Sequence, residues 1–285
     1  MQKHSVVPSV AVLAFAIAVA SPSPVHAAAA YDNCTGFVDT LPAVLTTQGT
    51  WCLRGDLVTS MASGSAITIG TSNVTLDCNG FKLGGLAAGA TSTARGVNAE
   101  NRMNLTVRDC GIRGFYRGIN IGGGGGHLVE DNRLDFNLYV GIRVTGQNNL
   151  VRGNRVFETG GYPFAEFAHS ILAIFVEADV IDNIVDGVLP SNGFTTAYGI
   201  FATSPSPVIR GNTVRGVDGG DFRYPVGISG AVGGRGRIEG NHVEGIGGGW
   251  GIERGYLCIG NSVTGTNVPY AECENSEGNF GVDEV

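Results

Sequence analysis

Three segments of the chain concentrate the kinds of side chain that bind sugars and move protons. Residues 155–169, 184–198 and 213–226 contain Glu158, Tyr162, Glu166, His169, Asp186, Tyr198, Asp218, Asp221, Arg223 and Tyr224. Aromatic rings stack on the flat faces of sugars, and guanidinium and carboxylate groups hydrogen-bond to acid groups and hydroxyls. The segments therefore predict a carbohydrate-binding wall, with Tyr162, Glu166 and Asp221 among its substrate-binding residues.

Cleavage of an acidic polysaccharide by a lyase requires three functions in such a site. A cation neutralises the uronate carboxylate, a base removes the proton at C5, and an acid assists the leaving oxygen. The candidates are Arg117, Arg143 and Arg223 for the first function, and His169, Tyr198 and Tyr224 for the other two. A glycoside hydrolase requires two carboxylates at a defined separation. The segments contain carboxylates but no clear pair, so lyase-type cleavage is favoured over hydrolysis.

A short phrase recurs along the chain and predicts the scaffold of this wall. An Asn lies between apolar stretches at Asn79, Asn132, Asn154, Asn183, Asn212, Asn241 and Asn261, and Cys110 takes the same position between the first two. Self-similarity at this spacing is typical of a solenoid whose repeats are stacked coils. An inward Asn at each turn can hydrogen-bond the same residue one coil above and below, as a ladder.

A second phrase places further residues on one edge of the coils. Gly-Ile-like pairs begin at Gly96, Gly118, Gly141, Ser170, Gly199, Gly227 and Gly251, and the step from each of the first six to the next ladder position is 13 or 14 residues. The residue before each pair is Arg95, Arg117, Val140, His169, Tyr198, Val226 or Trp250. The residue two places after its first member is Asn98, Asn120, Arg143, Leu172, Phe201, Ser229 or Glu253. With Ile inward, Arg117, Arg143, Trp250 and Glu253 are expected to face outward and bind substrate.

Composition restricts the class of protein and its location. The chain has 285 residues, 46 of them Gly, and a net charge of −7, which argues against a nucleic-acid binder. Residues 1–27 read as a signal peptide that ends at Val25-His26-Ala27, so we expect a secreted or periplasmic monomer without a membrane span. Residues 28–66 are predicted as an N-terminal cap, 67–266 as the repeats and 267–285 as a C-terminal cap.

Six cysteines fit an exported protein and, in principle, allow 15 pairings. The repeat register favours Cys78–Cys110, because these residues lie close to the same position on neighbouring coils about 4.8 Å apart. Cys34 and Cys52 share the segment before the repeats, and Cys258 and Cys273 bracket the last turn, so we expect each of these to form a pair. The alternative for Cys110 is a small buried residue in place of Asn.

The phrases Asn73-Val-Thr-Leu-Asp-Cys-Asn-Gly80 and Asn104-Leu-Thr-Val-Arg-Asp-Cys110, with the Gly-Asn turns, resemble those of secreted right-handed parallel β-helix proteins of the pectate-lyase-like group. The resemblance covers most of the mature chain. It implies an all-β, single-stranded right-handed parallel β-helix of about eight coils, and right-handed winding agrees with the rule for parallel crossovers. Members of known activity act on polysaccharides in a groove along the outside of the helix.

The resemblance does not extend to catalytic motifs. The signatures of polygalacturonases, alginate epimerases and pectate lyases are absent, and His127 lies between Gly126 and Leu128 in no such motif. The alternative to an enzyme is therefore a non-catalytic envelope or surface module, structural or adhesive. A periplasmic accessory protein for metal delivery is disfavoured by only five His and three Met.

No cofactor is expected, and Ca²⁺ is the one ion considered. Asp179, Asp182 and Asp186 offer the oxygen ligands that Ca²⁺ prefers, although they do not follow the Gly-rich calcium-binding repeat.

Overall fold

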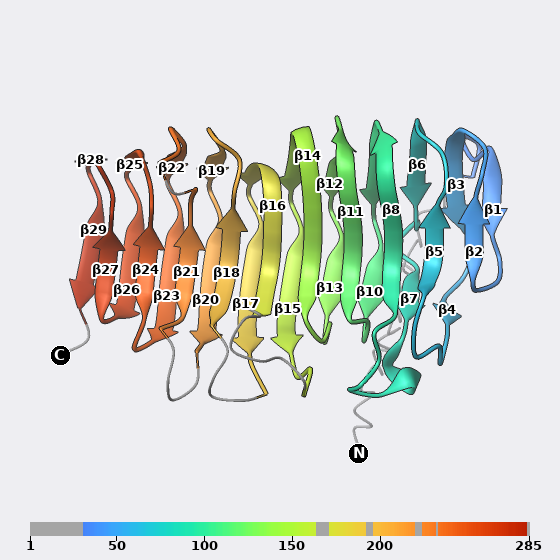
Figure 1. Cartoon of the computed structure of the whole chain (residues 1–285), viewed down its shortest axis with the longest axis horizontal. Coiled ribbons are helices and arrows are strands. Elements are labelled where there is room, and N and C mark those ends of the chain that lie inside the picture. Colours follow the sequence, from blue (N-terminus) through green and yellow to red (C-terminus); the bar gives the residue numbers. More distant parts are fainter. Residues whose placement is uncertain (1–30, 164–170, 192–195, 220–223, 232, 284–285) are drawn as a thin grey trace, which may run out of the picture. The chain divides into compact units, whose positions relative to one another are not determined.

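The computed structural model describes residues 31–163, 171–191, 196–219, 224–231 and 233–283. These residues form a right-handed parallel β-solenoid of about eight coils, as predicted. Figure 1 shows the coils following one another in sequence order along the stack. The described helical structure is a single short 3-10 turn, η1 (Leu86–Ala88). The predicted signal peptide, residues 1–27, lies outside the described residues.

Each coil contributes strands to three parallel series. The first series comprises β2 (Ala43–Leu45), β5 (Ser65–Ile69), β8 (Arg95–Met103), β11 (Arg117–Gly125), β14 (Val140–Arg152), β16 (Ile171–Ile181), β18 (Ala197–Ala202), β21 (Val226–Ser229), β24 (Trp250–Glu253) and β27 (Val268–Ala271). The second comprises β1 (Gly36–Val38), β3 (Gly49–Leu53), β6 (Val74–Asp77), β9 (Leu105–Arg108), β12 (Leu128–Glu130), β19 (Val208–Arg210), β22 (Arg237–Glu239), β25 (Leu257–Ile259) and β28 (Asn275–Glu277). Strands β14 and β16 are long enough to serve both series, which join into one 19-stranded sheet.

The third series is a separate sheet of ten strands. It comprises β4 (Leu57–Val58), β7 (Lys82–Gly84), β10 (Gly111–Arg113), β13 (Arg133–Asp135), β15 (Arg155–Gly160), β17 (Ile184–Leu189), β20 (Thr213–Asp218), β23 (His242–Gly247), β26 (Ser262–Thr266) and β29 (Phe280–Asp283). The predicted caps contribute to the same sheets, because residues 28–66 contain β1–β4 and residues 267–285 contain β27–β29.

The interior is apolar and follows the register of the strands. In the first series, Ile119, Ile142, Ile174, Ile200 and Ile228 pair one above another and are fully buried. The apolar residues on either side of the repeated Asn are also buried: Val129, Leu134, Val151, Val156, Val185, Ile209, Val214, Ile238 and Val243. Burying each such side chain contributes about 1.5–3 kcal/mol.

The predicted Asn ladder runs from Asn132 to Asn261 and continues to Asn279. At each step, Oδ1 of one Asn accepts hydrogen bonds from the backbone N–H and from Nδ2 of the Asn one coil earlier, at 2.9–3.1 Å. Asn79, which was also predicted as a member of the ladder, is not part of it. It is half-buried with φ 50°, and its Nδ2 donates to Leu53 O instead, because Cys78 takes the inward position at this turn.

The repeated Gly of the Gly-Ile phrase is explained by close stacking of the coils. A Cβ atom at Gly96, Gly118, Gly141, Gly199, Gly227 or Gly251 would lie 2.5–2.7 Å from a carbonyl oxygen of the next coil. A side chain at any of these six positions would force the backbone to shift, whereas the coil of β16 accommodates Ala173 at the equivalent position. The phrase therefore marks the point where each strand of the first series packs directly on its neighbour.

The repeated phrases predicted the wrong register for one coil. The structure pairs Val140 with Leu172 and Ile142 with Ile174, so the phrase of this coil is Ala173-Ile174 rather than Ser170-Ile171. The step to Asn183 is then ten residues, not 13. Strand β14 carries an irregularity between Val144 and Asn149, whereas β16 crosses the same region with three fewer residues. Leu172 consequently takes the position predicted for His169, and Phe175 takes the position predicted for Leu172.

All three predicted disulfides are present: Cys34–Cys52, Cys78–Cys110 and Cys258–Cys273. They are compatible with an extracellular or periplasmic protein. Among the described residues, none belongs to a helix long and apolar enough to cross a membrane.

Replacing Cys78 and Cys110 with Ser is expected to lower the free energy of unfolding by about 3 kcal/mol, because the bond closes a long loop in the unfolded chain. Urea unfolding of the double variant, monitored by circular dichroism, measures this change. The matched control is Cys258→Ser with Cys273→Ser, which opens the shorter loop of 15 residues and should cost less. An unchanged midpoint for the first variant would contradict the prediction.

Candidate functional site

The outer face of the first strand series carries two columns of side chains in hydrogen-bonded register. One column is Arg95, Arg117, Val140, Leu172, Tyr198, Val226 and Trp250. The other is Asn98, Asn120, Arg143, Phe175, Phe201, Ser229 and Glu253. The stack thus changes from basic and amide side chains, through aromatic side chains, to a Ser-Glu pair.

A pocket of about 250 Å³ lies where the basic and aromatic parts of these columns meet. It is lined by Arg117, Tyr139, Val140, Arg143, Leu172, Phe175, Tyr198 and Phe201. The two arginines, Phe175, Tyr198 and Phe201 are half-buried, so each side chain is held in place while part of it stays accessible. We call this hollow the groove pocket.

The two arginines of the groove pocket have no carboxylate partner within the part of the chain that the structure describes. Arg117 Nη1 donates to Asn120 Oδ1 at 3.1 Å, and Arg117 Nε is buried without a hydrogen-bond partner. Asn120 Nδ2 in turn donates to Glu100 Oε1 at 3.1 Å. Burial, and then the nearby charge of Arg143, lower the pKa of Arg117. The pocket therefore holds positive charge that favours an anion.

Aromatic rings surround these charges. The guanidinium carbon of Arg117 lies 5.6 Å from the centre of the Tyr116 ring and 5.9 Å from that of Tyr139. That of Arg143 lies 5.8 Å from the centre of the Phe175 ring. These distances are at the limit of cation–π attraction, so the rings orient the guanidinium groups without neutralising them. The same rings present apolar faces to a ligand.

Two tyrosine hydroxyls belong to the groove pocket. Tyr139 stacks on Tyr116 with ring centres 4.7 Å apart, and Tyr162 meets both rings edge-on. Tyr198 stacks on Phe201 with ring centres 5.0 Å apart. Burial raises the pKa of Tyr139 and of Tyr198, so both hydroxyls stay protonated at neutral pH. They are hydrogen-bond donors rather than bases.

The structure brings together only some of the residues predicted for the site. Arg117, Arg143 and Tyr198 share the groove pocket, and Tyr162 packs beside it. Trp250 stacks with the exposed Tyr224 at 6.3 Å, outside the pocket. Glu253 is 1% exposed and is not an open binding residue. The predicted residues Glu166, His169, Asp221 and Arg223 lie outside the described residues.

Sequence reasoning missed Tyr139, Phe175 and the role of Phe201. Tyr139 precedes the outward column and was not part of any repeated phrase. Phe175 has the same position as Arg143 and Phe201 in neighbouring coils. The correct register at Ala173-Ile174 would have placed it there.

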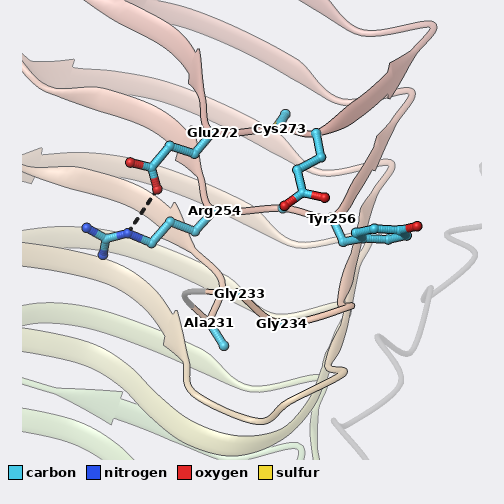
Figure 2. A pocket seen from close by; sticks show the side chains of 9 residues that line it. Ala231, Gly233, Gly234, Arg254, Tyr256, Glu272 and Cys273 are labelled. Carbon is cyan, nitrogen blue, oxygen red and sulfur yellow. Dashed lines mark ion pairs between the residues drawn. The ribbon is translucent and has the colours of Figure 1, made fainter.

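A second hollow of about 350 Å³ lies at the turns that follow β24 and β27. Its lining includes Arg254, Tyr256, Glu272 and the backbone of Gly233 and Gly234. Figure 2 shows the side chains of Arg254 and Glu272 extending together, away from Tyr256. Their ion pair, Arg254 Nε to Glu272 Oε2, is 3.4 Å long. We call this hollow the turn pocket.

The carboxylates considered for Ca²⁺ are not assembled into a site. Asp179 Oδ1 accepts a hydrogen bond from Val208 N at 2.9 Å, and Asp182 lies in a turn with φ 55°. Over the described ranges, no group of three or more His, Cys, Asp and Glu side chains is placed to hold a metal ion.

A single solenoid whose coils stack their strands in parallel defines the class of parallel β-helix proteins. Residues 44–214 match the family model described as right handed beta helix region. This match covers more than half of the chain, and the chain belongs to that family. None of the curated proteins matches the chain.

Two solved structures are similar to the chain at low sequence identity. The A-module of a mannuronan C-5 epimerase from Azotobacter vinelandii is 14% identical with a TM-score of 0.41, over 90% of this chain and 93% of that one. An alginate lyase from a Paenibacillus species is 12% identical with a TM-score of 0.36, over 84% of this chain and 95% of that one. These likenesses are too low to indicate a substrate.

Proposed function

We propose that the protein is exported and binds an acidic polysaccharide along the outer face of the first strand series, with the groove pocket as the principal site. One observation carries the proposal. Two half-buried guanidinium groups without carboxylate partners share one pocket with Phe175, Tyr198 and Phe201. A uronate residue matches this pocket, because its carboxylate pairs with arginine and its ring face stacks on an aromatic side chain.

The charge of the pocket distinguishes an acidic from a neutral sugar. Arg117 and Arg143 are partly shielded from water, so an unpaired charge there is less well solvated than on an open surface. A ligand carboxylate restores the missing partner and gains charge-assisted hydrogen bonds. A neutral glycan supplies only hydroxyl acceptors, and its binding is weaker.

Binding is better supported than cleavage. A lyase requires a base, and of the described residues that line the groove pocket none is Asp, Glu or His. Tyr139 and Tyr198 are protonated donors that suit the leaving oxygen or a ligand carboxylate. Lyase-type cleavage therefore requires a base that does not line the groove pocket. His169 stays the predicted candidate for this base.

A polysaccharide panel on the purified mature protein tests the proposal. Calorimetric titration should show binding of polyuronates, weakening as salt rises, and at least tenfold weaker binding of a neutral glucan. The same samples, with Ca²⁺ and with a chelator, are followed for unsaturated-uronate absorbance and for new reducing ends. A rise in both assigns a lyase, whereas binding without turnover assigns a binding module. Equal binding of the neutral glucan, or no binding of any polyuronate, contradicts the proposal.

A further inference from the structure

The side chain of Asn120 connects Arg117, in the groove pocket, to the coil before it. Arg117 Nη1 donates to Asn120 Oδ1 at 3.1 Å. Asn120 Nδ2 donates to Asn98 Oδ1 at 2.7 Å and to Glu100 Oε1 at 3.1 Å. Asn120 is fully buried, although its column faces outward. Both hydrogens of Nδ2 and the oxygen are therefore in use, as a buried amide requires.

The acceptors around Asn120 determine which end of its amide faces Arg117. An ionised carboxylate accepts hydrogen bonds and donates none, so Glu100 must meet Nδ2 of Asn120 and not Oδ1. Asn98 Oδ1 also accepts from Arg95 Nη1, at 3.4 Å, and is thereby oriented as an acceptor as well. The oxygen of Asn120 is then the end that faces the guanidinium group of Arg117.

Glu100 brings a carboxylate close to the arginines of the groove pocket without pairing with either. A Cβ atom at Gly122 would collide with Glu100 Oε2 and would lie 3.4 Å from Arg143 Nη1, so both side chains border the space above this glycine. Within the described residues, no ion pair joins Glu100 to Arg117 or Arg143. The other oxygen of Glu100 is held by Asn120. A neutral amide therefore separates this carboxylate from Arg117.

We propose that Asn120 is a positioning residue, whose neutral oxygen fixes the guanidinium group of Arg117 in the groove pocket and leaves its charge for the carboxylate of an acidic sugar. This inference rests on the proposed function and assigns the buried amide a role in it. A carboxylate in place of Asn120 would also hold Arg117, but it would neutralise the charge that the ligand requires. A side chain too short to reach Arg117 would leave the guanidinium group without this partner.

The test replaces the amide of Asn120 with a carboxylate of nearly the same shape. The variants are Asn120→Asp, Arg117→Gln and their double variant. The matched control is Asn98→Asp, which adds the same charge to the same column one coil away, beside Arg95 instead of Arg117. Near-ultraviolet circular dichroism establishes that each variant is folded.

Two measurements are made on each variant. Calorimetric titration measures the binding of a polyuronate. Nitrogen NMR of arginine-labelled protein, without ligand, follows the rotation of the Arg117 guanidinium group, and its signal is assigned by its loss in Arg117→Gln. A purely structural role for Asn120 would lower the free energy of unfolding and would change neither measurement.

Asn120→Asp should weaken polyuronate binding about thirtyfold, as Arg117→Gln should, because an ion pair within the protein takes up the charge of Arg117. The double variant should bind within about threefold of Arg117→Gln alone, since both changes act on one guanidinium group. Rotation of that group should slow in Asn120→Asp, because a charge-assisted hydrogen bond is stronger than one to an amide. Asn98→Asp should weaken binding less than about threefold and leave the rotation unchanged.

Asn120→Ser replaces Asn120→Asp if the Asp variant does not fold. Ser is too short to reach Arg117 from the same position, so rotation of the guanidinium group should become faster and binding should weaken about tenfold. In the Arg117→Gln background, Asn120→Ser should cause no further loss of binding.

Three results would overturn the inference. Unchanged rotation of the Arg117 group in the folded Asn120 variant means that Asn120 does not hold it. Binding within threefold of the parent in that variant means that the contact does not serve the ligand. Equal losses in Asn120→Asp and Asn98→Asp mean that added negative charge, and not its place beside Arg117, weakens binding. A parent protein that binds no polyuronate, although the rotation changes as expected, refutes the proposed function and the ligand role of Arg117, while the contact with Asn120 stands.

Discussion

Replacing both Arg117 and Arg143 with Gln is expected to weaken polyuronate binding about a thousandfold. Each guanidinium–carboxylate contact contributes about 2 kcal/mol, and two such contacts correspond to about three powers of ten. Gln keeps a polar, although shorter, side chain and removes the charge. The loss should be largest at low salt, because the removed contacts are electrostatic. Calorimetric titration at two ionic strengths measures it.

The control for this double variant removes two positive charges that lie outside the groove pocket. Arg155 and Arg235 are exposed, have no ion pair within the described residues, and lie outside the groove pocket. Arg155→Gln with Arg235→Gln should therefore weaken binding less than threefold, through the change in net charge alone. Equal losses in the two double variants would mean that general attraction, and not the groove pocket, determines binding.

Replacing Asn183 with Ala is expected to lower the free energy of unfolding by about 5 kcal/mol. The side chain donates to Val151 O, Ile181 O and Asn212 Oδ1, and accepts from N and Nδ2 of Asn154. Nδ2 has two hydrogens for three acceptors, so the side chain makes about four full hydrogen bonds of about 1 kcal/mol each. The backbone N–H of Asn154 also loses its partner in the interior, where no water replaces it.

Urea unfolding measures the effect of Asn183→Ala, and Asn267→Ala provides the matched control. Asn267 is exposed and outside the ladder, so its replacement should change the free energy of unfolding by less than about 0.5 kcal/mol. A loss near 1 kcal/mol for Asn183→Ala would mean that the ladder relaxes around a missing member. The Asn241→Ala variant should behave like Asn183→Ala, because its hydrogen bonds follow the same pattern.

The candidate site was only partly predictable, and Phe175 illustrates the reason. The sequence placed Arg143 and Phe201 in one outward column, which the structure confirms. It placed Leu172 between them because the step to the ladder was taken as constant. Strand β16 is three residues shorter across the irregularity of β14, and local sequence carries no sign of this difference.

Glu253 is a second residue whose surroundings the sequence predicted only in part. Its place in the outward column was predicted, and its pairing with Ser229 in register follows from that column. Its burial was not predicted: Glu253 is 1% exposed and is held by Ser229 of the preceding coil and by the neighbouring Arg254.

The sequence by itself determined the parallel β-helix, the Asn ladder from Asn132 to Asn261 and the three disulfides. The turns, the inward Asn and the close-packed Gly recur in coil after coil, so each local phrase carries the same signal, and the register of those phrases brings Cys78 and Cys110 together. The tertiary structure alone decided the register of β16, the gathering of Arg117, Tyr139 and Phe175 in one pocket, and the burial of Glu253. The physical reason is that contacts in a parallel stack join residues one or more coils apart, and hydrogen-bond pairing between strands, rather than spacing along the chain, sets which residues meet.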